Sequence, residues 1–242
     1  MTRAGENPPA APKRFFKSAA LAEEGDAFVL TLDGRPARTR AGRLLSCPSH
    51  RLAAAIAAEW NAQGDRLLFP AMPMTRFRMT VIDRGDEDAA LWRRAVLDFL
   101  ASDLVCYRAE APAALIERQA GSWDPILAWA ASEGVALRTG AGVGFIAQPA
   151  ESLAGGARLL AGATADMLIA IRSAAEITGS AVMALALWRR AFAAGALFDA
   201  ARTDEKFQAE KWGADAEAEA RARRLEADFL DAARYLSLAG AG

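Results

Sequence analysis

Few side chains in this sequence could carry out catalysis. The single histidine, His50, follows Cys47 by three residues, and a Cys-His pair would give a thiolate nucleophile together with its general base. A fold-specific geometry would have to bring the two side chains together, because their spacing alone does not. We interpret His50 as a polar residue at the start of a helix. We interpret Cys47 and Cys106 as half-buried, reduced thiols that form neither a disulfide framework nor a zinc site.

A run of alternating glycines, "TGAGVG" over residues 139–144, is the next candidate. A dinucleotide-binding fingerprint places G-x-G-x-x-G between a strand and a helix. Here the glycines alternate, no lysine follows, and Pro149 soon ends the segment. The pattern is typical of a flexible turn between helices.

Carboxylates are abundant, and a general acid-base pair would need two of them in an apolar setting that raises a pKa. Asp83 and Asp103 come closest, since each lies beside aliphatic residues and near an arginine, Arg84 or Arg108. Buried ion pairs or helix caps explain these positions more simply. A metal site would need several histidines or clustered thiols as ligands, and the sequence has neither. The sequence therefore predicts no catalytic residue, no metal and no cofactor.

The charge balance argues against several other functions. The chain has 29 basic and 30 acidic residues, a net charge of −1, which gives no electrostatic footprint for nucleic acid or anionic lipid. No run of about eighteen apolar residues is present to span a membrane. The opening "MTRAGENPPAAPKRFF" lacks the apolar stretch of a secretory signal.

The first part of the chain has strand-like patterning. Apolar and polar residues alternate within residues 27–46, and Asp33-Gly34 supplies the positive φ angles of a tight hairpin turn, so we expect a small antiparallel meander. Ser49 can then cap a helix. The apolar residues of that helix recur at helical spacing: Leu52, Ile56 and Trp60.

Helical periodicity dominates from residue 86 onward. Residues 151–170 and 173–194 are predicted to form an antiparallel helix pair, broken near Thr178-Gly179-Ser180. We therefore expect an α+β fold. It comprises a flexible lead over residues 1–14, a β-rich domain with one helix over residues 15–85, and a helical domain over residues 86–242.

The stretch "DEKFQAEKWGAD", residues 204–215, places two aromatic residues inside a charged segment. We expect an amphipathic helix whose acidic residues, Glu210 and Asp215 among them, point outward. Trp212 is expected to pack back onto the helical domain. Gly213 would let the chain change direction before the last helix.

Several blocks of the chain resemble, in order, the ATP12 chaperones, a family that assists assembly of the F1 sector of ATP synthase. The blocks run from about Phe15 to Leu238 and are "LDGRPARTRAG", "IAAEWNAQGD", "MPMTRFRMTVIDR", "SDLVCYRA", "SWDPILAWA" and "DEKFQAEKWGAD". The resemblance implies a non-catalytic, monomeric protein that transiently binds the free F1 α subunit. It would act in the bacterial cytoplasm, or in the mitochondrial matrix of a eukaryote.

The resemblance also implies which residues matter. Those expected to maintain the structure are Trp60, Arg76, Asp83, Asp103, Tyr107, Trp123, Trp212 and Gly213, and Asp124 belongs to the same motifs. Those expected to contact the partner are Glu205, Phe207, Glu210 and Asp215. Of these, Glu210 is the strongest candidate, because a charge between two aromatic residues is not needed for packing.

Two other functions fit the same residues. One is a small-molecule enzyme that uses a carboxylate pair in an interdomain cleft, for which a specific ligand would raise the melting temperature. The other is a structural subunit, which would co-purify with its partner constitutively.

Overall fold

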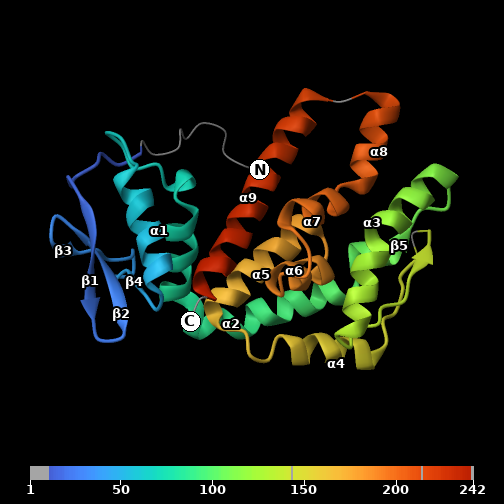
Figure 1. Ribbon diagram of the computed structural model, residues 1–242, viewed down its shortest axis with the longest axis horizontal. Coiled ribbons are helices and arrows are strands. Elements are labelled where there is room, and N and C mark those ends of the chain that lie inside the picture. Colours follow the sequence, from blue (N-terminus) through green and yellow to red (C-terminus); the bar gives the residue numbers. More distant parts are fainter. Residues whose placement is uncertain (1–10, 143, 214, 241–242) are drawn as a thin grey trace, which may run out of the picture. The chain divides into compact units, whose positions relative to one another are not determined.

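The computed structural model describes residues 11–142, 144–213 and 215–240 (Figure 1). These residues divide into two compact units, residues 11–83 and residues 84–240, and the division falls inside helix α2 (Pro73–Ala101). The predicted fold class is confirmed, since strands β1 to β4 precede a unit built mainly of helices.

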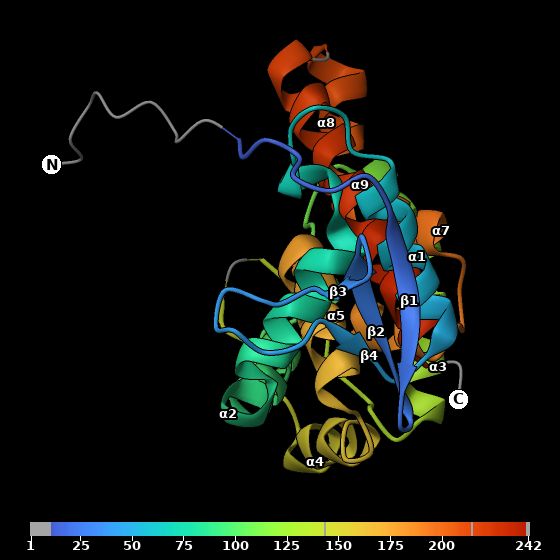
Figure 2. The same cartoon turned by 90° about the vertical axis from the view of Figure 1, so that its left-hand side faces the viewer.

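The sheet of the first unit is an antiparallel meander (Figure 2). Strands β1 (Ala19–Glu24) and β2 (Ala27–Leu32) pair from Ala19 opposite Leu32 to Glu24 opposite Ala27. Two short strands, β3 (Arg35–Pro36) and β4 (Ser46–Cys47), also pair with β2. The predicted turn is present, because Asp33 and Gly34 have φ angles of 48° and 79°.

Helix α1 (His50–Asn61) covers this sheet in the way the sequence predicts. The Ser49 hydroxyl accepts a hydrogen bond from the Leu52 amide, and Leu52, Ile56 and Trp60 are buried. The Trp60 ring packs against Phe16 and Phe69, with centroid distances of 5.5 and 6.3 Å.

Helix α2 starts against α1, after a short 3-10 turn η1 (Phe69–Ala71). The Glu59 carboxylate accepts hydrogen bonds at 2.8 Å from the Met74 and Thr75 amides, which have no partner within α2. Further along α2, Asp83 accepts a hydrogen bond from the Thr39 hydroxyl. Arg76 is exposed.

The flexible lead predicted for residues 1–14 needs a correction. Residues 1–10 lie outside the described residues, but residues 11–14 are held by backbone hydrogen bonds. The Leu67 amide donates to Pro12 and the Arg14 amide donates to Asp65, each at 2.8 Å. Alanines and prolines without a partner would favour disorder, whereas here a neighbouring segment supplies the partner.

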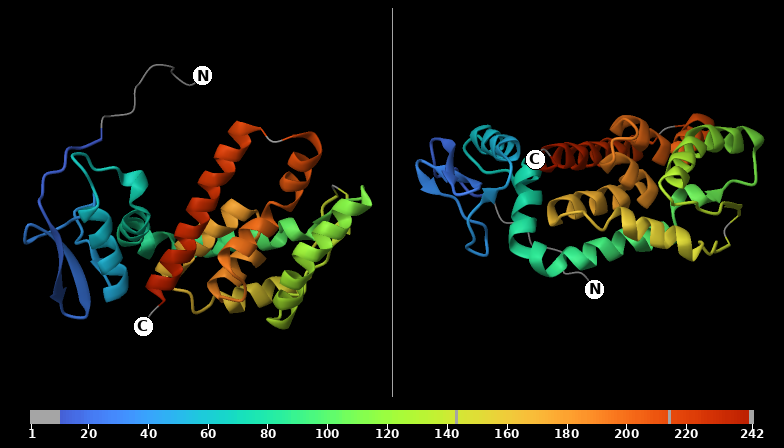
Figure 3. Two further views of the ribbon diagram at one scale, coloured as in Figure 1. Left: turned by 45° about the horizontal axis from the view of Figure 1, so that its top comes forward. Right: turned by 60° about the horizontal axis from the view of Figure 1, so that its bottom comes forward.

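The second unit is built around one helix that is buried on all sides. In α6 (Ala181–Trp188), every residue from Ala181 to Leu187 is buried. Helices α3 (Ala113–Ser132), α5 (Ala165–Thr178), α7 (Ala194–Ala201) and α9 (Ala216–Ala239) pack around it. Helices α5 and α9 also lie side by side (Figure 3).

The boundaries predicted for two of these helices are wrong. Residues 151–194 form three helices instead of two, α4 (Ala150–Leu159), α5 and α6. Thr164 caps the start of α5, accepting a hydrogen bond from the Met167 amide. Gly179, with a φ of 68°, ends it, at the break that the sequence predicts.

The glycine run also differs from the prediction. Gly140 and Ala141 form strand β6, which pairs in parallel with β5 (Tyr107–Arg108), so Tyr107 lies opposite Gly140. The Gly142 amide donates to the Arg108 carbonyl at 3.1 Å. A pairing partner more than thirty residues away therefore turns a predicted flexible turn into a strand. Val143 lies outside the described residues.

Asp103 is a helix cap at the centre of the second unit. The side chain is fully buried and accepts hydrogen bonds from the Val105 amide in the 3-10 turn η2 (Leu104–Cys106) and from the Val182 amide at the start of α6. Burial raises the pKa of Asp103 to about 6, and hydrogen bonds from Ser180, Val182 and Val105 limit the rise. The nearby Arg108 binds Asp124 at 2.7 Å.

We predict that residues 86–242 retain most of their helicity when they are produced alone, because α6 and the helices around it all belong to this part of the chain. Far-ultraviolet circular dichroism of the fragment tests this. The spectrum of an unfolded chain would show that the first unit is required for folding.

We predict a distinct pH dependence for Asp103. Folded Asp103 retains its proton to a higher pH than unfolded Asp103, so its contribution to stability falls as the pH rises from about 4 to about 6, and is constant above that. Urea unfolding of wild type and Asp103→Asn, from pH 4 to pH 8, measures this as a difference between the two proteins. If the stability of the wild type relative to Asp103→Asn instead increased as the pH rises, the pKa of Asp103 would be lower in the folded protein than in the unfolded one.

Candidate functional site

Helix α8 (Thr203–Trp212) carries most of the predicted partner-binding residues and is held to α3 through Phe207. Phe207 is only 5% exposed. Two cations flank its ring, with the Arg118 guanidinium 5.3 Å and the Lys211 ammonium 5.7 Å from the centroid. The prediction that Phe207 contacts a partner is therefore wrong: it anchors α8 within the protein.

Glu210 is exposed but has a partner. Its two carboxylate oxygens accept hydrogen bonds from the two terminal nitrogens of Arg118 on α3, at 2.7 and 2.8 Å. The hydrogen bond to Arg118 lowers the pKa of Glu210 and raises that of Arg118. The Glu210 side chain is still 57% exposed, so its outer side remains accessible to another protein.

Trp212 lies on the surface. The prediction that it packs back onto the helical domain is therefore wrong. The residue is 79% exposed. Phe207 and Trp212 are five residues apart, which at about 100° per residue places them roughly 140° apart around the helix. Only one of them can face α3, and Phe207 occupies that face. Glu210 is three residues from Phe207, near the same face, which brings it within reach of Arg118.

The turn that follows α8 is built as predicted. Gly213 has a φ of 93°, a conformation that favours glycine. Asp215 then caps α9, accepting hydrogen bonds from the Glu217 and Ala218 amides at 3.3 and 3.2 Å. We call the exposed residues Glu205, Glu210 and Trp212 of α8, together with Asp215 at the start of α9, the α8–α9 corner.

Other charges along α8 are paired locally. Glu205 binds Arg202 at 2.8 Å, and Lys206 binds Asp199 on α7. Asp204 accepts a hydrogen bond at 2.7 Å from Gln119, which is almost fully buried in α3. These contacts fix the orientation of α8 without burying its outer face.

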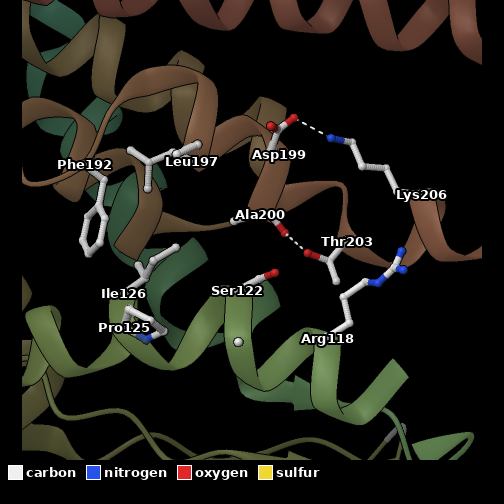
Figure 4. A pocket seen from close by; sticks show the side chains of 12 residues that line it. Arg118, Ser122, Pro125, Ile126, Phe192, Leu197, Asp199, Ala200, Thr203 and Lys206 are labelled. Atoms are coloured by element: carbon white, nitrogen blue, oxygen red, sulfur yellow. Dashed lines mark hydrogen bonds and ion pairs between the residues drawn. The ribbon is translucent and has the colours of Figure 1, made fainter. Parts of the chain in front are cut away.

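Two hollows border α8. One, of about 480 Å³, lies between α3 and α7–α8, with apolar side chains at one end and Arg118, Asp199 and Lys206 at the other (Figure 4). Pro125 in its wall has no N–H, so the Gly121 carbonyl lacks its usual partner within α3. The other hollow, of about 350 Å³, lies between α8 and α9 and is lined by alanines and charged residues.

Several of the remaining motif residues have contacts within the fold. Trp60, Arg76 and Asp83 belong to the first unit. Trp123, which is 1% exposed, donates a hydrogen bond from its indole nitrogen to the Ala200 carbonyl at 2.7 Å, directly before α8. Asp124 pairs with Arg108. Arg118 could not be predicted as the partner of Glu210, because the two residues are 92 positions apart and no local pattern connects them.

Chemically reactive groups do not gather at this site. Within the described residues, no group of three or more His, Cys, Asp or Glu side chains could hold a metal ion. Burial, together with the charge of Asp103, raises the pKa of Cys106 to about 12, so its thiol is unreactive at neutral pH. No helix among the described residues is long and apolar enough to cross a membrane.

Comparison with known proteins identifies the family. The model of the ATP12 chaperone protein family matches residues 13–131. Atp12 from Paracoccus denitrificans is 34% identical with a TM-score of 0.89, and a point variant of it gives 0.90. Each match covers 94% of this chain and 98% of the other. A candidate chaperone from Agrobacterium tumefaciens is 36% identical, with a TM-score of 0.90, over 94% of this chain and 86% of the other.

The chain belongs to the ATP12 chaperone family, and its function is that of a chaperone whose partner is another protein. Asp83 and Asp103, the two carboxylates that come closest to an acid-base pair in the sequence, both accept hydrogen bonds within the fold, Asp83 from Thr39 and Asp103 from the start of α6.

We predict that the Arg118–Glu210 pair contributes little to stability, because exposed ion pairs gain little in water. Arg118→Ala, Glu210→Ala and the double variant should each melt within ~2 °C of the wild type. Differential scanning calorimetry measures this. A large loss in both single variants that the double variant shares, without the two losses adding up, would show that the pair holds α8 in place.

Proposed function

We propose that this protein binds the free α subunit of the F1 sector of ATP synthase and covers its β-facing surface until the β subunit arrives. An isolated subunit of a ring exposes apolar surface that is buried after assembly, and such surface drives non-specific association. A chaperone of the ATP12 family that covers it transiently would prevent aggregation. We place this activity in the bacterial cytoplasm, or in the mitochondrial matrix of a eukaryote.

The observation that best supports a contact surface is the α8–α9 corner. Tryptophan is among the residues that contribute most to protein interfaces, and Trp212 is 79% exposed where the chain turns. Charged residues precede and follow it along the chain, Glu210 and Lys211 before it and Asp215 after it, and polar rims surround the anchors of other interfaces. We propose that Trp212 is the apolar anchor and that Glu210, Glu205 and Asp215 form an acidic rim.

The rim charges suit a transient complex. Glu205 and Glu210 are each held by an arginine of the chaperone itself, and Asp215 caps α9. A basic group on the α subunit would compete with these internal partners instead of meeting a free carboxylate. The charges therefore favour specific orientation over tight binding, which allows release when the β subunit competes.

We predict that Glu210→Lys weakens the complex with the α subunit at least tenfold at low salt, and less at high salt, because the added charge repels a basic partner and salt screens it. Size-exclusion chromatography after co-expression shows whether the complex forms, and titration of the purified proteins gives the affinity. A matched control is Glu176→Lys, which breaks a comparable exposed pair with Arg172 on α5. If Glu210→Lys and Glu176→Lys both bound the α subunit as tightly as the wild type, Glu210 would have no role in binding.

A charge swap separates a direct contact from a structural role. In Arg118→Glu with Glu210→Arg, the ion pair is restored but the acidic group is moved to α3. We expect this double variant to melt like the wild type and to bind the α subunit as poorly as Glu210→Lys. Recovered binding would instead mean that the pair acts only by holding α8.

A further inference from the structure

A pocket of about 500 Å³ lies within the first unit, between the segment that carries Phe15 and Phe16 and the β2–β3 hairpin. Trp60 lines it and is only 4% exposed, whereas Phe15 is 71% exposed. Arg35 and Arg38 contribute exposed guanidinium groups from the hairpin side. The pocket therefore combines aromatic surface with positive charge.

Trp60 brings to this pocket a hydrogen-bond donor without an acceptor. Its indole nitrogen Nε1 is buried, and none of the described residues accepts a hydrogen bond from it. Buried polar groups are nearly always paired, and the indole nitrogen of Trp123, equally buried, donates to the Ala200 carbonyl. The exception at Trp60 points to an acceptor that is not among the described residues.

The charges around the pocket indicate what kind of acceptor would fit. Arg38 donates to the Gly42 carbonyl at 2.7 Å through one terminal nitrogen, which leaves its other donors for a ligand. The one carboxylate in the lining, Asp33, accepts hydrogen bonds from the Lys17 and Ser18 amides at 3.0 and 2.9 Å, and these bonds lower its pKa. Two guanidinium groups face one carboxylate, so a carboxylate ligand is favoured.

We propose that this pocket binds a segment of a client polypeptide in which an Asp or Glu carboxylate lies next to an apolar side chain. The carboxylate accepts hydrogen bonds from the Trp60 indole N–H and from Arg35 or Arg38. The apolar side chain packs against Phe15 and Phe16. Aromatic and arginine side chains together are the composition that dominates protein contacts, which favours a polypeptide over a small metabolite.

The burial of the Trp60 nitrogen adds a requirement. A carboxylate reaches it only when side chains packed around Trp60 move aside, and the rings that pack on it are Phe16 and Phe69, so the ligand must replace the contacts that are given up. A carboxylate alone cannot do that, whereas an aromatic residue beside a glutamate can. This inference extends beyond the proposed function and does not depend on it, because it can be tested without the α subunit.

The test uses the six tryptophans of the full-length protein, whose indole N–H groups give separate signals in a ¹⁵N-correlated NMR spectrum. Trp60→Phe removes one signal and so assigns it. The probes are the peptide acetyl-Leu-Phe-Glu-Leu-amide, its glutamine counterpart, and sodium acetate. We expect the glutamate peptide to shift the Trp60 signal, the glutamine peptide to bind at least tenfold more weakly, and acetate to leave the signal unchanged.

Variants then check the donors. Trp60→Phe keeps a ring against Phe16 and Phe69 but lacks the N–H, and should lose at least fivefold in affinity for the glutamate peptide, measured by calorimetry. If Trp60→Phe does not fold, Arg35→Gln with Arg38→Gln, at exposed positions, should show the same loss. Arg51→Gln, an exposed arginine outside the pocket, is the control.

Three results would overturn the proposal. One is a Trp60 signal that neither peptide moves. A second is equal affinity of the glutamate and glutamine peptides. A shift produced by acetate as strongly as by the peptide would assign the pocket to free carboxylic acids, and would likewise reject a polypeptide ligand.

Discussion

The complete burial of α6 is the constraint on which the second unit depends. A helix that is apolar on every side needs neighbours all around it, and α3, α5, α7 and α9 supply them. The same burial removes water from the amides at its N-terminus, so acceptors must come from the protein. Ser180 and the buried Asp103 provide them, which explains why a carboxylate is found in an apolar interior.

Helix α8 shows the opposite arrangement. It joins the bundle through Phe207 and a set of polar contacts to α3 and α7, and only Thr203 and Phe207 along its length are buried. A helix held at one face leaves the other face free, and that is where Trp212 lies. Glu210 lies nearer to α3, paired with Arg118, and its side chain is still 57% exposed. The stability of the fold thus resides in α6 and its neighbours, while the surface chemistry that we assign to partner binding lies on an element that contributes little to the core.

Local signals in the sequence predicted those features that depend on neighbouring residues. The Asp33-Gly34 turn, the Ser49 cap with the apolar face ending at Trp60, and the change of direction at Gly213 are all present. Features set by distant residues were missed. Strand β6 exists because β5 pairs with it, and Glu210 meets Arg118 from across the fold. The burial of Phe207 and exposure of Trp212 could not be assigned, because either ring could have faced the core.

The central claim, that the α8–α9 corner receives the partner, is tested most directly by hydrogen exchange of the protein alone and in complex with purified F1 α subunit. Amides protected by an interface exchange more slowly, and those of a stable core are unaffected. The account predicts slower exchange in the complex for peptides that cover α8 and the first half of α9, with no change in α6. Unchanged exchange at α8 and α9, with protection confined to other elements, would contradict it.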